Sequence, residues 1–256
     1  MIKLNSILIV NDDGIDAVGM KSMIKIAQTI CEDVWVVAPT HEQSGVSRAV
    51  SVHNPIYVER RAEKRFAIDG TPADCVIMAI EVLMNDKPDL ILSGVNRGHN
   101  AADFLHISGT VGGAGMGSTY HIPSMALSLM GNIRNRSLPL EWEMVEHFAP
   151  ELIEKLFNMS LDAQSIQNLN FPNCSIDNVK GIKVCEHGKR QEPFIIVDKR
   201  ENLRGSDYYW INFKGIDENP QINAELASLQ DNYITVTAVT QNLTNFAMND
   251  DIKNQL

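Results

Sequence analysis

The sequence lacks a segment that could cross a membrane and a segment that could direct export. No apolar run in the 256 residues is as long as a bilayer-spanning helix needs to be. Residues 1–10 look like a strand that stops at Asn11, so they have neither the apolar length nor the cleavage site of a secretory signal. We therefore expect a cytoplasmic protein with no membrane partner.

Cysteine is scarce and is not arranged as a metal site. The chain has four cysteines, with no C-x-x-C spacing and no histidine in zinc-finger register beside them. This pattern argues against a zinc module and favours reduced thiols. The four are Cys31, Cys75, Cys174 and Cys185.

Positive charge is also scarce, and the formal net charge is -10. Binding to a nucleic-acid polymer depends on many Lys and Arg contacts to phosphate, so the composition argues against that class of partner. Small phosphorylated ligands remain compatible with it. A few local positive groups or one bound dication can supply the charge that they need.

Short apolar runs alternate with helical patterns through the first half of the chain. With 44% hydrophobic residues, a chain of this length can bury a large core. The alternation predicts a doubly wound, mainly parallel sheet with helices on both faces. Expected strands are 6–10, 34–37, 66–68, 89–92 and 124–129, and expected helices are 20–30, 71–84 and 112–120.

The sequence beyond Gly131 has a different texture. Residues 141–159 predict an amphipathic helix, and four short strand patterns follow with charged connections between them. We expect a mostly β extension here, ending in a frayed polar tail at 249–256. The strand patterns are 182–184, 194–197, 208–213 and 233–239.

Polar loops follow the expected strands, and a parallel sheet binds ligands at that edge. Asp12 and Asp13 come directly after the first strand. Adjacent carboxylates repel each other unless a cation or a shared proton relieves them, and both are ligands suited to Mg²⁺ or Mn²⁺. An ordinary turn is the competing interpretation, because turns also prefer Asn, Asp and Gly.

Other loops could complete such a site. Ser44 and Asn96 follow later strands and could bring neutral oxygens to the two aspartates, although both residue types are common in loops for their own sake. The segment 108–110 (SGT) precedes a helix start, where it could hold a phosphate or merely cap the helix. His99 and His106 fit no recognised metal-ligand spacing, and we expect loop or surface roles for them.

In their order and spacing, these motifs resemble the SurE family of survival-protein nucleotidases, also called 5′/3′-nucleotidases. The resemblance covers nearly the whole chain. It rests on residues 11–14 (NDDG), 37–39 (VAP), 44–47 (SGVS), 70–74 (GTPAD), 93–96 (SGVN), Asn100 and 108–111 (SGTV), with 204–205 (RG) and 208–211 (YYWI) near the C-terminus.

The resemblance implies a Rossmann-like three-layer α/β/α fold and one divalent ion per subunit, Mg²⁺ or Mn²⁺. It implies hydrolysis of nucleoside 5′/3′-monophosphates, and in some members of short polyphosphate. The implied metal ligands are Asp12, Asp13, Ser44 and Asn96, of which the two aspartates are the catalytic pair. The candidate phosphate or substrate ligands are Asn11, Gly45, Asn100, Ser108, Gly109 and Thr110, and further candidate substrate contacts are Arg48, Arg97 and His106.

The resemblance also implies an oligomer, either a homodimer or a homotetramer. It makes 1–256 a single domain, with a catalytic core at 1–130 and an oligomerisation extension at 170–240. Three positions depart from the family pattern: Val18 replaces a common Pro, Ile107 an aromatic, and Met116 a Glu. None is an implied metal ligand, but the last two border the substrate region.

Several alternatives stay open on the sequence alone. Asp12 could be a ligand, a general base or a nucleophile. A non-catalytic nucleotide-binding module could use the same scaffold, although the G-x-G-x-x-G fingerprint is missing after the first strand. A phosphatase with an aspartyl intermediate is a further alternative, and it lacks the expected D-x-D spacing. A purely structural oligomer is the last.

Overall fold

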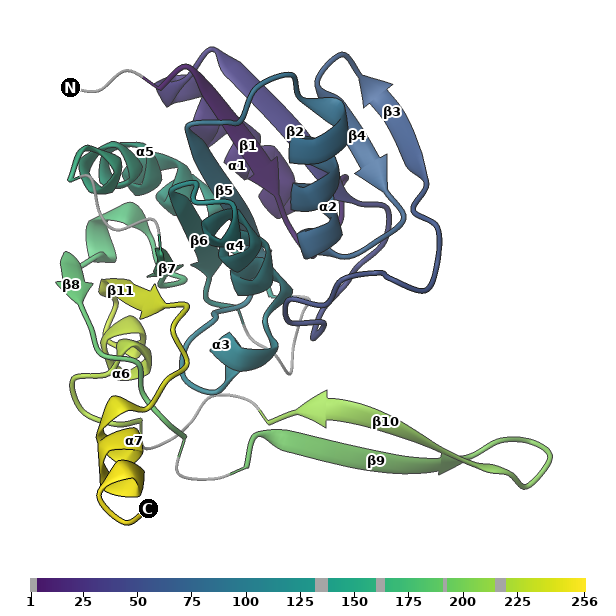
Figure 1. Cartoon of the computed structure of the whole chain (residues 1–256), viewed down its shortest axis with the longest axis vertical. Helices are drawn as coiled ribbons and strands as arrows, with labels where there is room; N and C mark the ends of the chain where they lie inside the picture. The colour runs from purple at the N-terminus through teal and green to yellow at the C-terminus, as the bar shows by residue number, and fades with distance from the viewer. Residues whose placement is uncertain (1–3, 132–137, 160–163, 191–192, 215–219) are drawn as a thin grey trace.

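The structure is a computed structural model, and it describes residues 4–131, 138–159, 164–190, 193–214 and 220–256. Within these residues, nine strands form one sheet and two more form a separate hairpin (Figure 1). The sheet order is β3 (Val58–Ala62), β4 (Arg65–Ile68), β2 (Asp33–Pro39), β1 (Ser6–Val10), β5 (Leu90–Arg97), β6 (Ser124–Leu129), β7 (Ser165–Phe171), β11 (Ile234–Thr240) and β8 (Ile182–Val184).

The sheet is mainly parallel, as predicted. Strands β4, β2, β1, β5, β6 and β7 all run the same way, and β8 is parallel to β11. The two antiparallel pairs are β3 with β4 and β11 with β7. Strand β1 lies between β2, to which the chain passes next, and β5, which comes later in the chain, so the strand order reverses at β1. This is the position where ligands bind in open α/β sheets.

Alternate residues of β1 enter two different cores. Ile7 and Ile9 pack into the cluster that contains helices α1 (Val18–Ile30) and α5 (Trp142–Asn158). Leu8 and Val10 pack into the cluster that contains α2 (Pro72–Met78). Helix α4 (Gly109–Thr119) contacts α2 and therefore covers the same face as α2. Helices on both faces confirm the three-layer α/β/α prediction.

The start of α2 follows from its sequence. Thr71 is the N-cap, and its hydroxyl accepts from the backbone N–H of Asp74, while the Asp74 carboxylate accepts from the backbone N–H of Thr71. Pro72 occupies the first helical position, where a missing N–H costs nothing. The helical path continues as a π-helical segment, Ala79–Leu83, so the predicted helix at 71–84 is confirmed.

Several elements differ from the prediction, and strand β3 was not among the expected strands. Strand β5 continues to Arg97 through a shift in its register with β6, so Asn96 lies in a strand and not in a loop. Strand β7 was not expected, because polar residues interrupt its apolar pattern. The C-terminal tail forms helix α7 (Phe246–Lys253), which Asn245 caps by accepting from the backbone N–H of Met248. The remaining short helices are α3 (Phe104–Ile107), α6 (Glu225–Gln230) and a 3₁₀ turn, Ile176–Asn178.

Only part of the expected β extension stands apart from the body. Strands β8 and β11 belong to the main sheet, whereas β9 (Ile195–Glu201) and β10 (Asp207–Phe213) form an antiparallel hairpin that projects from it (Figure 1). At the base of the hairpin, the rings of Phe194 and Phe213 lie 4.9 and 5.3 Å from that of Phe104. Among the described helices, none combines the length and apolar character that a bilayer crossing needs.

A buried carboxylate joins α6 to the loops near the base of the hairpin. The side chain of Glu225 accepts from the backbone N–H of Ala102 at 2.8 Å and of Gly188 at 2.8 Å, and its Oε1 lies 3.0 Å from His187 Nδ1. Burial alone would raise the pKa of Glu225, but the hydrogen bonds from His187 and these backbone groups outweigh it. The pKa therefore lies below its ordinary value of 4.5.

We predict that Glu225→Gln lowers the free energy of unfolding by about 1–3 kcal/mol at pH 7, because one charge-assisted hydrogen bond is lost. A lowered carboxyl pKa stabilises the fold above the unfolded-state value and loses this effect as pH falls through the folded-state value. The difference between the variant and the wild type should therefore shrink below about pH 4.5. Urea unfolding from pH 7 to pH 3.5 measures it, with the exposed Glu154→Gln as control. A difference that grows on acidification would contradict this assignment.

Candidate active site

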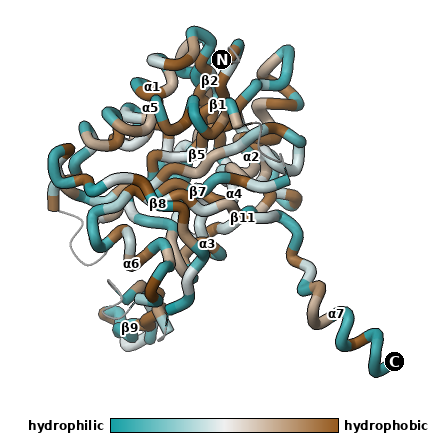
Figure 2. Tube along the Cα trace, turned by 90° about the vertical axis from the view of Figure 1, so that its left-hand side faces the viewer, coloured by the Kyte–Doolittle hydropathy of each residue, from teal (hydrophilic) through white to brown (hydrophobic). Residues whose placement is uncertain are grey.

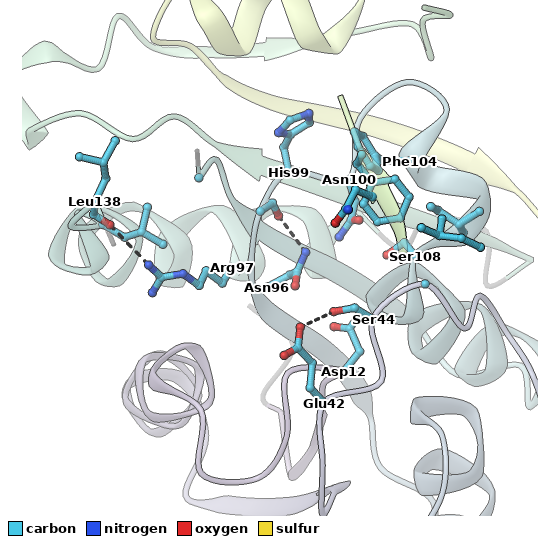
Figure 3. A pocket seen from close by; sticks show the side chains of 18 of the residues that line it. Asp12, Glu42, Ser44, Asn96, Arg97, His99, Asn100, Phe104, Ser108 and Leu138 are labelled. Atoms are coloured by element: carbon cyan, nitrogen blue, oxygen red, sulfur yellow. Dashed lines mark hydrogen bonds between the residues drawn. The ribbon is translucent and has the colours of Figure 1, made fainter. Parts of the chain in front are cut away.

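The carboxyl ends of three adjacent strands bring three of the four predicted metal ligands to one cavity. Asp12 follows β1, Ser44 lies in the loop after β2, and Asn96 lies near the end of β5. All three line a cavity of about 520 Å³, where Figure 3 shows Asp12 and Ser44 close together below Asn96. A volume of this size lies in the range of ligand-binding pockets. The strand order therefore explains why positions more than 80 residues apart meet at this edge.

Asp12 is a buried carboxylate with only 4% of its surface exposed. Its Oδ1 accepts from the Thr110 hydroxyl at 2.7 Å. Gly109, the first residue of α4, lies so close that a Cβ there would stand 2.8 Å from the Asp12 Cβ. Burial, and then the negative charge of Asp13, raise the pKa of Asp12 from 3.8 to about 7, although the hydrogen bonds from Thr110 oppose this rise. The carboxylate is therefore short of compensating positive charge.

Hydrogen bonds orient Asp13, Ser44 and Asn96. Asp13 Oδ2 accepts from the backbone N–H of Arg97 at 2.9 Å. The Ser44 hydroxyl donates to Glu42 Oε1 at 2.8 Å. The Asn96 amide nitrogen donates to the Gly98 carbonyl at 2.9 Å, and Figure 3 shows its oxygen on the side of Asp12. The Ser44 hydroxyl oxygen and the Asn96 amide oxygen therefore keep lone pairs that could bind a cation.

The chemistry of these donors fits a hard divalent cation. Two carboxylates, one hydroxyl and one amide oxygen form an all-oxygen set, and the raised pKa of Asp12 indicates an excess of negative charge that a dication would remove. No group of three or more His, Cys, Asp or Glu residues suited to a metal occurs among the described residues. The fit therefore depends on Ser44 and Asn96 as much as on the aspartates.

A phosphate-sized anion would find donors next to this set. Ser108 caps α4 by accepting from the backbone N–H of Val111, and it lines the cavity. Asn100 also lines the cavity, and a buried polar network fixes it. Its backbone N–H donates to Asn170 Oδ1 at 2.8 Å, its amide donates to Ser128 Oγ at 2.8 Å, and its carbonyl accepts from Asn168 at 2.7 Å. This network fixes Asn100, which lines the cavity, to residues of strands β6 and β7.

The cavity includes some of the predicted residues and excludes others. Those that line it are Asp12, Ser44, Gly45, Asn96, Arg97, Asn100 and Ser108. Gly109 and Thr110 contact Asp12 instead. Asn11 closes its own turn through hydrogen bonds with Gly14.

Two candidate substrate contacts lie outside the cavity lining. The Arg48 guanidinium donates to the Gly115 carbonyl and to Gln241 Oε1. The His106 ring packs edge-on against His187, with 5.4 Å between the ring centroids. Arg97, the third candidate, remains at the cavity wall, and its guanidinium donates to the Leu138 carbonyl at 3.4 Å.

Several cavity residues were not predicted as site residues. Glu42 belongs to a loop that the sequence marks as polar, and its contact with Ser44 could have been suspected from their spacing. Phe104 and the hairpin residues Asp198 and Asn212 carry no local signal that joins them to Asp12. His99 is 3% exposed, and burial, with Arg190 next, lowers its pKa to about 4, so its ring is neutral near pH 7.

Comparisons with known proteins agree that this chain is similar to SurE proteins. Residues 7–193 match the model of the family described as survival protein SurE. The 5'-nucleotidase SurE of Rhodopseudomonas palustris (strain TIE-1) is 42% identical over 253 residues, which cover 98% of this chain and 99% of that protein. The 5'-nucleotidase SurE of Caulobacter vibrioides (strain NA1000 / CB15N) is 42% identical over 239 residues, covering 93% and 91%. The crystal structure of the SurE protein from Aquifex aeolicus matches with a TM-score of 0.83 at 31% identity, covering 98% of this chain and 99% of that chain.

We predict that Asp12→Asn stabilises the metal-free protein at pH 8 by on the order of 2 kcal/mol. The amide removes the buried charge, and its oxygen can still accept from Thr110. A raised carboxyl pKa means that the wild type loses stability as pH rises from about 4 to about 7. The advantage of the variant should therefore be absent near pH 3.5 and complete above pH 7.

Urea unfolding in the presence of a chelator measures this difference. The exposed Asp69→Asn is the matched control and should leave stability unchanged. An Asp12→Asn variant that is less stable than the wild type at pH 8 would show that the carboxylate is held by favourable contacts and not at a cost.

Proposed function

The chain belongs to the SurE family, and from this premise we infer that it is a phosphomonoesterase that hydrolyses nucleoside monophosphates to nucleoside and phosphate. We further propose that it acts on both 5′- and 3′-monophosphates and, more slowly, on short polyphosphate. One observation supports the chemistry most directly. A buried carboxylate, Asp12, lies beside a second carboxylate on the wall of a cavity large enough for a nucleotide.

We propose one divalent ion per subunit, Mg²⁺ or Mn²⁺, held by Asp12, Asp13, Ser44 and Asn96. When bound there, the ion would neutralise charge on the phosphoryl oxygens as the bond to the leaving oxygen breaks. The orientation of Asp12, Ser44 and Asn96 supports this set, since the hydrogen bond of each leaves an oxygen lone pair available. The proposed chemistry needs no second divalent ion.

The remaining cavity residues would bind the substrate phosphate. Ser108 can donate its hydroxyl, the Asn100 amide has a second N–H beyond the one bonded to Ser128, and Gly45 can offer its backbone N–H. We assign Asp12 mainly as a ligand. A pKa near 7 also suits a group that takes a proton from attacking water at neutral pH, so we retain a role as general base.

The competing functions account for fewer of the observations. A non-catalytic nucleotide-binding module needs no pair of carboxylates at the end of β1. In addition, the relatives of this chain reported above are named as enzymes. An aspartyl phosphatase would need a nucleophile clear of other contacts, whereas Thr110 and the start of α4 hold Asp12. A purely structural oligomer would not need the cavity.

We predict that Asp13→Asn lowers the turnover of a nucleoside monophosphate by at least about 100-fold, since a formal ligand charge is lost while the shape is kept. The measurement is a phosphate-release screen of nucleotides after chelation and re-addition of Mg²⁺, Mn²⁺ and other divalent ions. In parallel, the rise in melting temperature caused by each ion reports binding directly.

Asp16→Asn is the matched control, because Asp16 is exposed, pairs with Arg65 at 3.0 Å and does not line the cavity. It should keep both the activity and the metal-induced rise. Ser44→Ala and Asn96→Ala should lose much of both while remaining folded. An Asp13→Asn protein with normal turnover and unchanged metal dependence would remove the proposed site.

We also propose that the protein is a cytoplasmic homodimer or homotetramer that binds no nucleic-acid polymer, with 1–130 as its catalytic core. The hairpin β9–β10 supports an oligomer, because an isolated two-stranded hairpin is marginally stable in water. Its apolar side chains are exposed, with Tyr209 at 59% and Trp210 at 55%. Helix α7 also projects from the body and exposes Phe246 and Ile252 (Figure 2). Contacts with a second copy would bury both.

We predict that the wild type has a multiple of the 28.5 kDa subunit mass in light scattering at micromolar concentration. The double variant Tyr209→Ser/Trp210→Ser, or Phe246→Ser in α7, should shift the mass toward the monomer because apolar contact area is lost. Tyr57→Ser, which removes another exposed aromatic from a different surface, should not. A wild type that is monomeric under these conditions would contradict the proposal.

A further inference from the structure

The wall of the cavity far from β1 comes from the projecting hairpin. Asp198 of β9 and Ile211, Asn212 and Phe213 of β10 line the same cavity as Asp12 and Ser44. The metal-binding and phosphate-binding groups proposed above occupy one end of it. The hairpin therefore faces whatever part of the substrate extends beyond the phosphate, which in a nucleotide is the nucleoside.

Two hairpin residues form a polar pair on this wall. The Asn212 amide nitrogen donates to Asp198 Oδ2 at 2.8 Å. The register pairs Trp210 with Asp198, so Asn212 is the diagonal neighbour of Asp198 on the same face of the hairpin. The bond uses the amide nitrogen and one carboxylate oxygen. The second oxygen of Asp198 and the amide oxygen of Asn212 have no partner among the described residues, and both are acceptors.

The same cavity also has an apolar surface. The Phe104 and Phe213 rings meet edge to face at 5.3 Å, and both residues line the cavity with Ile211. A planar base fits an aromatic and aliphatic surface of this kind. The acceptor pair must then meet a part of the ligand that offers hydrogen-bond donors. A carboxylate also disfavours a second phosphate at that place, because like charges repel.

We propose that Asp198 and Asn212 bind the 2′-hydroxyl of the nucleotide sugar and make the enzyme select ribonucleotides over 2′-deoxyribonucleotides. The inference rests on the proposed nucleotidase function. Ribose hydroxyls are donors common to all ribonucleotides, whereas donors on the bases differ from one base to another. A carboxylate accepting from a hydroxyl forms a charge-assisted bond, which is stronger than a neutral one. A substrate that lacks the hydroxyl loses this bond.

The experiment compares kcat/KM for three substrates at saturating metal: a ribonucleoside 5′-monophosphate, its 2′-deoxy counterpart and phenyl phosphate, which has no sugar. We expect the wild type to favour the ribonucleotide by about 10-fold or more. Asp198→Ala should lower kcat/KM for the ribonucleotide by about 10- to 100-fold and leave the other two substrates within about twofold. The ratio of ribo to deoxy should then approach one, and Asn212→Ala should have a smaller effect of the same kind.

Asp207→Ala is the matched control. It removes a carboxylate from the same hairpin, where Asp207 pairs with Lys199 and does not line the cavity. It should leave all three kcat/KM values unchanged. Melting temperatures of the three variants should match the wild type, because the altered side chains are exposed.

Several outcomes would overturn the proposal. Equal kcat/KM for ribonucleotide and deoxyribonucleotide in the wild type would remove it, as would an Asp198→Ala effect that is equally large for phenyl phosphate. An effect that follows the base and not the sugar, seen by repeating the comparison with a purine and a pyrimidine nucleotide, would reassign the pair to base recognition. A wild type that releases phosphate from phenyl phosphate but from no nucleotide would refute the proposed function itself, and the sugar assignment with it.

Discussion

The structure is organised around a carboxylate that is buried beside another carboxylate. Asp12 lies at the end of the central strand, where β2 and β5 approach from both sides and the first residue of α4 approaches from above. Such a group is costly without compensating charge. Nearby features reduce the cost in part: Thr110 donates to it, and glycine at position 109 lets the helix start come close. The part of this electrostatic cost that remains makes the position suited to binding a cation.

Buried polar groups hold the rest of the cavity in place through their hydrogen bonds. Asn100 is fixed through its backbone and its side chain by residues of β6 and β7, and Glu225 fixes the following loop through Ala102. Each of these groups would destabilise the fold if it were unpaired. Their hydrogen bonds therefore keep the loop between β5 and α4 in one conformation, and that loop carries the phosphate donors.

The sequence was sufficient for the elements whose local pattern and tertiary position agree. Strands β1 and β6 are short and mainly apolar, and α2 begins with a complete set of helix-start residues. The sequence was insufficient where burial is polar. Strand β7 carries Gln167, Asn168 and Asn170, of which the last two bond to Asn100, so its pattern does not predict a buried strand. Asn96 was expected in a loop because the glycine before it suggested a break, yet β5 continues through a register shift.

The same distinction applies to the candidate site. The ligands proposed for the metal follow strand ends, and the topology of a parallel sheet predicts that strand ends converge. The far wall of the cavity has no such rule behind it. Asp198 and Asn212 lie about 100 residues or more beyond Asn96 in sequence, and only the packing of Phe194 and Phe213 on Phe104 brings their hairpin to the cavity. Arg48, by contrast, lies in the loop after β2 that also carries Ser44, but its guanidinium donates to Gly115 and Gln241 and does not line the cavity.

The division of the cavity between two structural parts has an evolutionary consequence. One wall belongs to a nine-stranded sheet whose residues are constrained by two cores, while the other belongs to a hairpin joined to the body mainly at its base. Mutations in the hairpin can therefore accumulate without disturbing the carboxylates at the end of β1. A lineage built on this plan can diversify by drift in one short module, and chimaeras that exchange 195–213 between homologues would be natural starting points for altering its specificity.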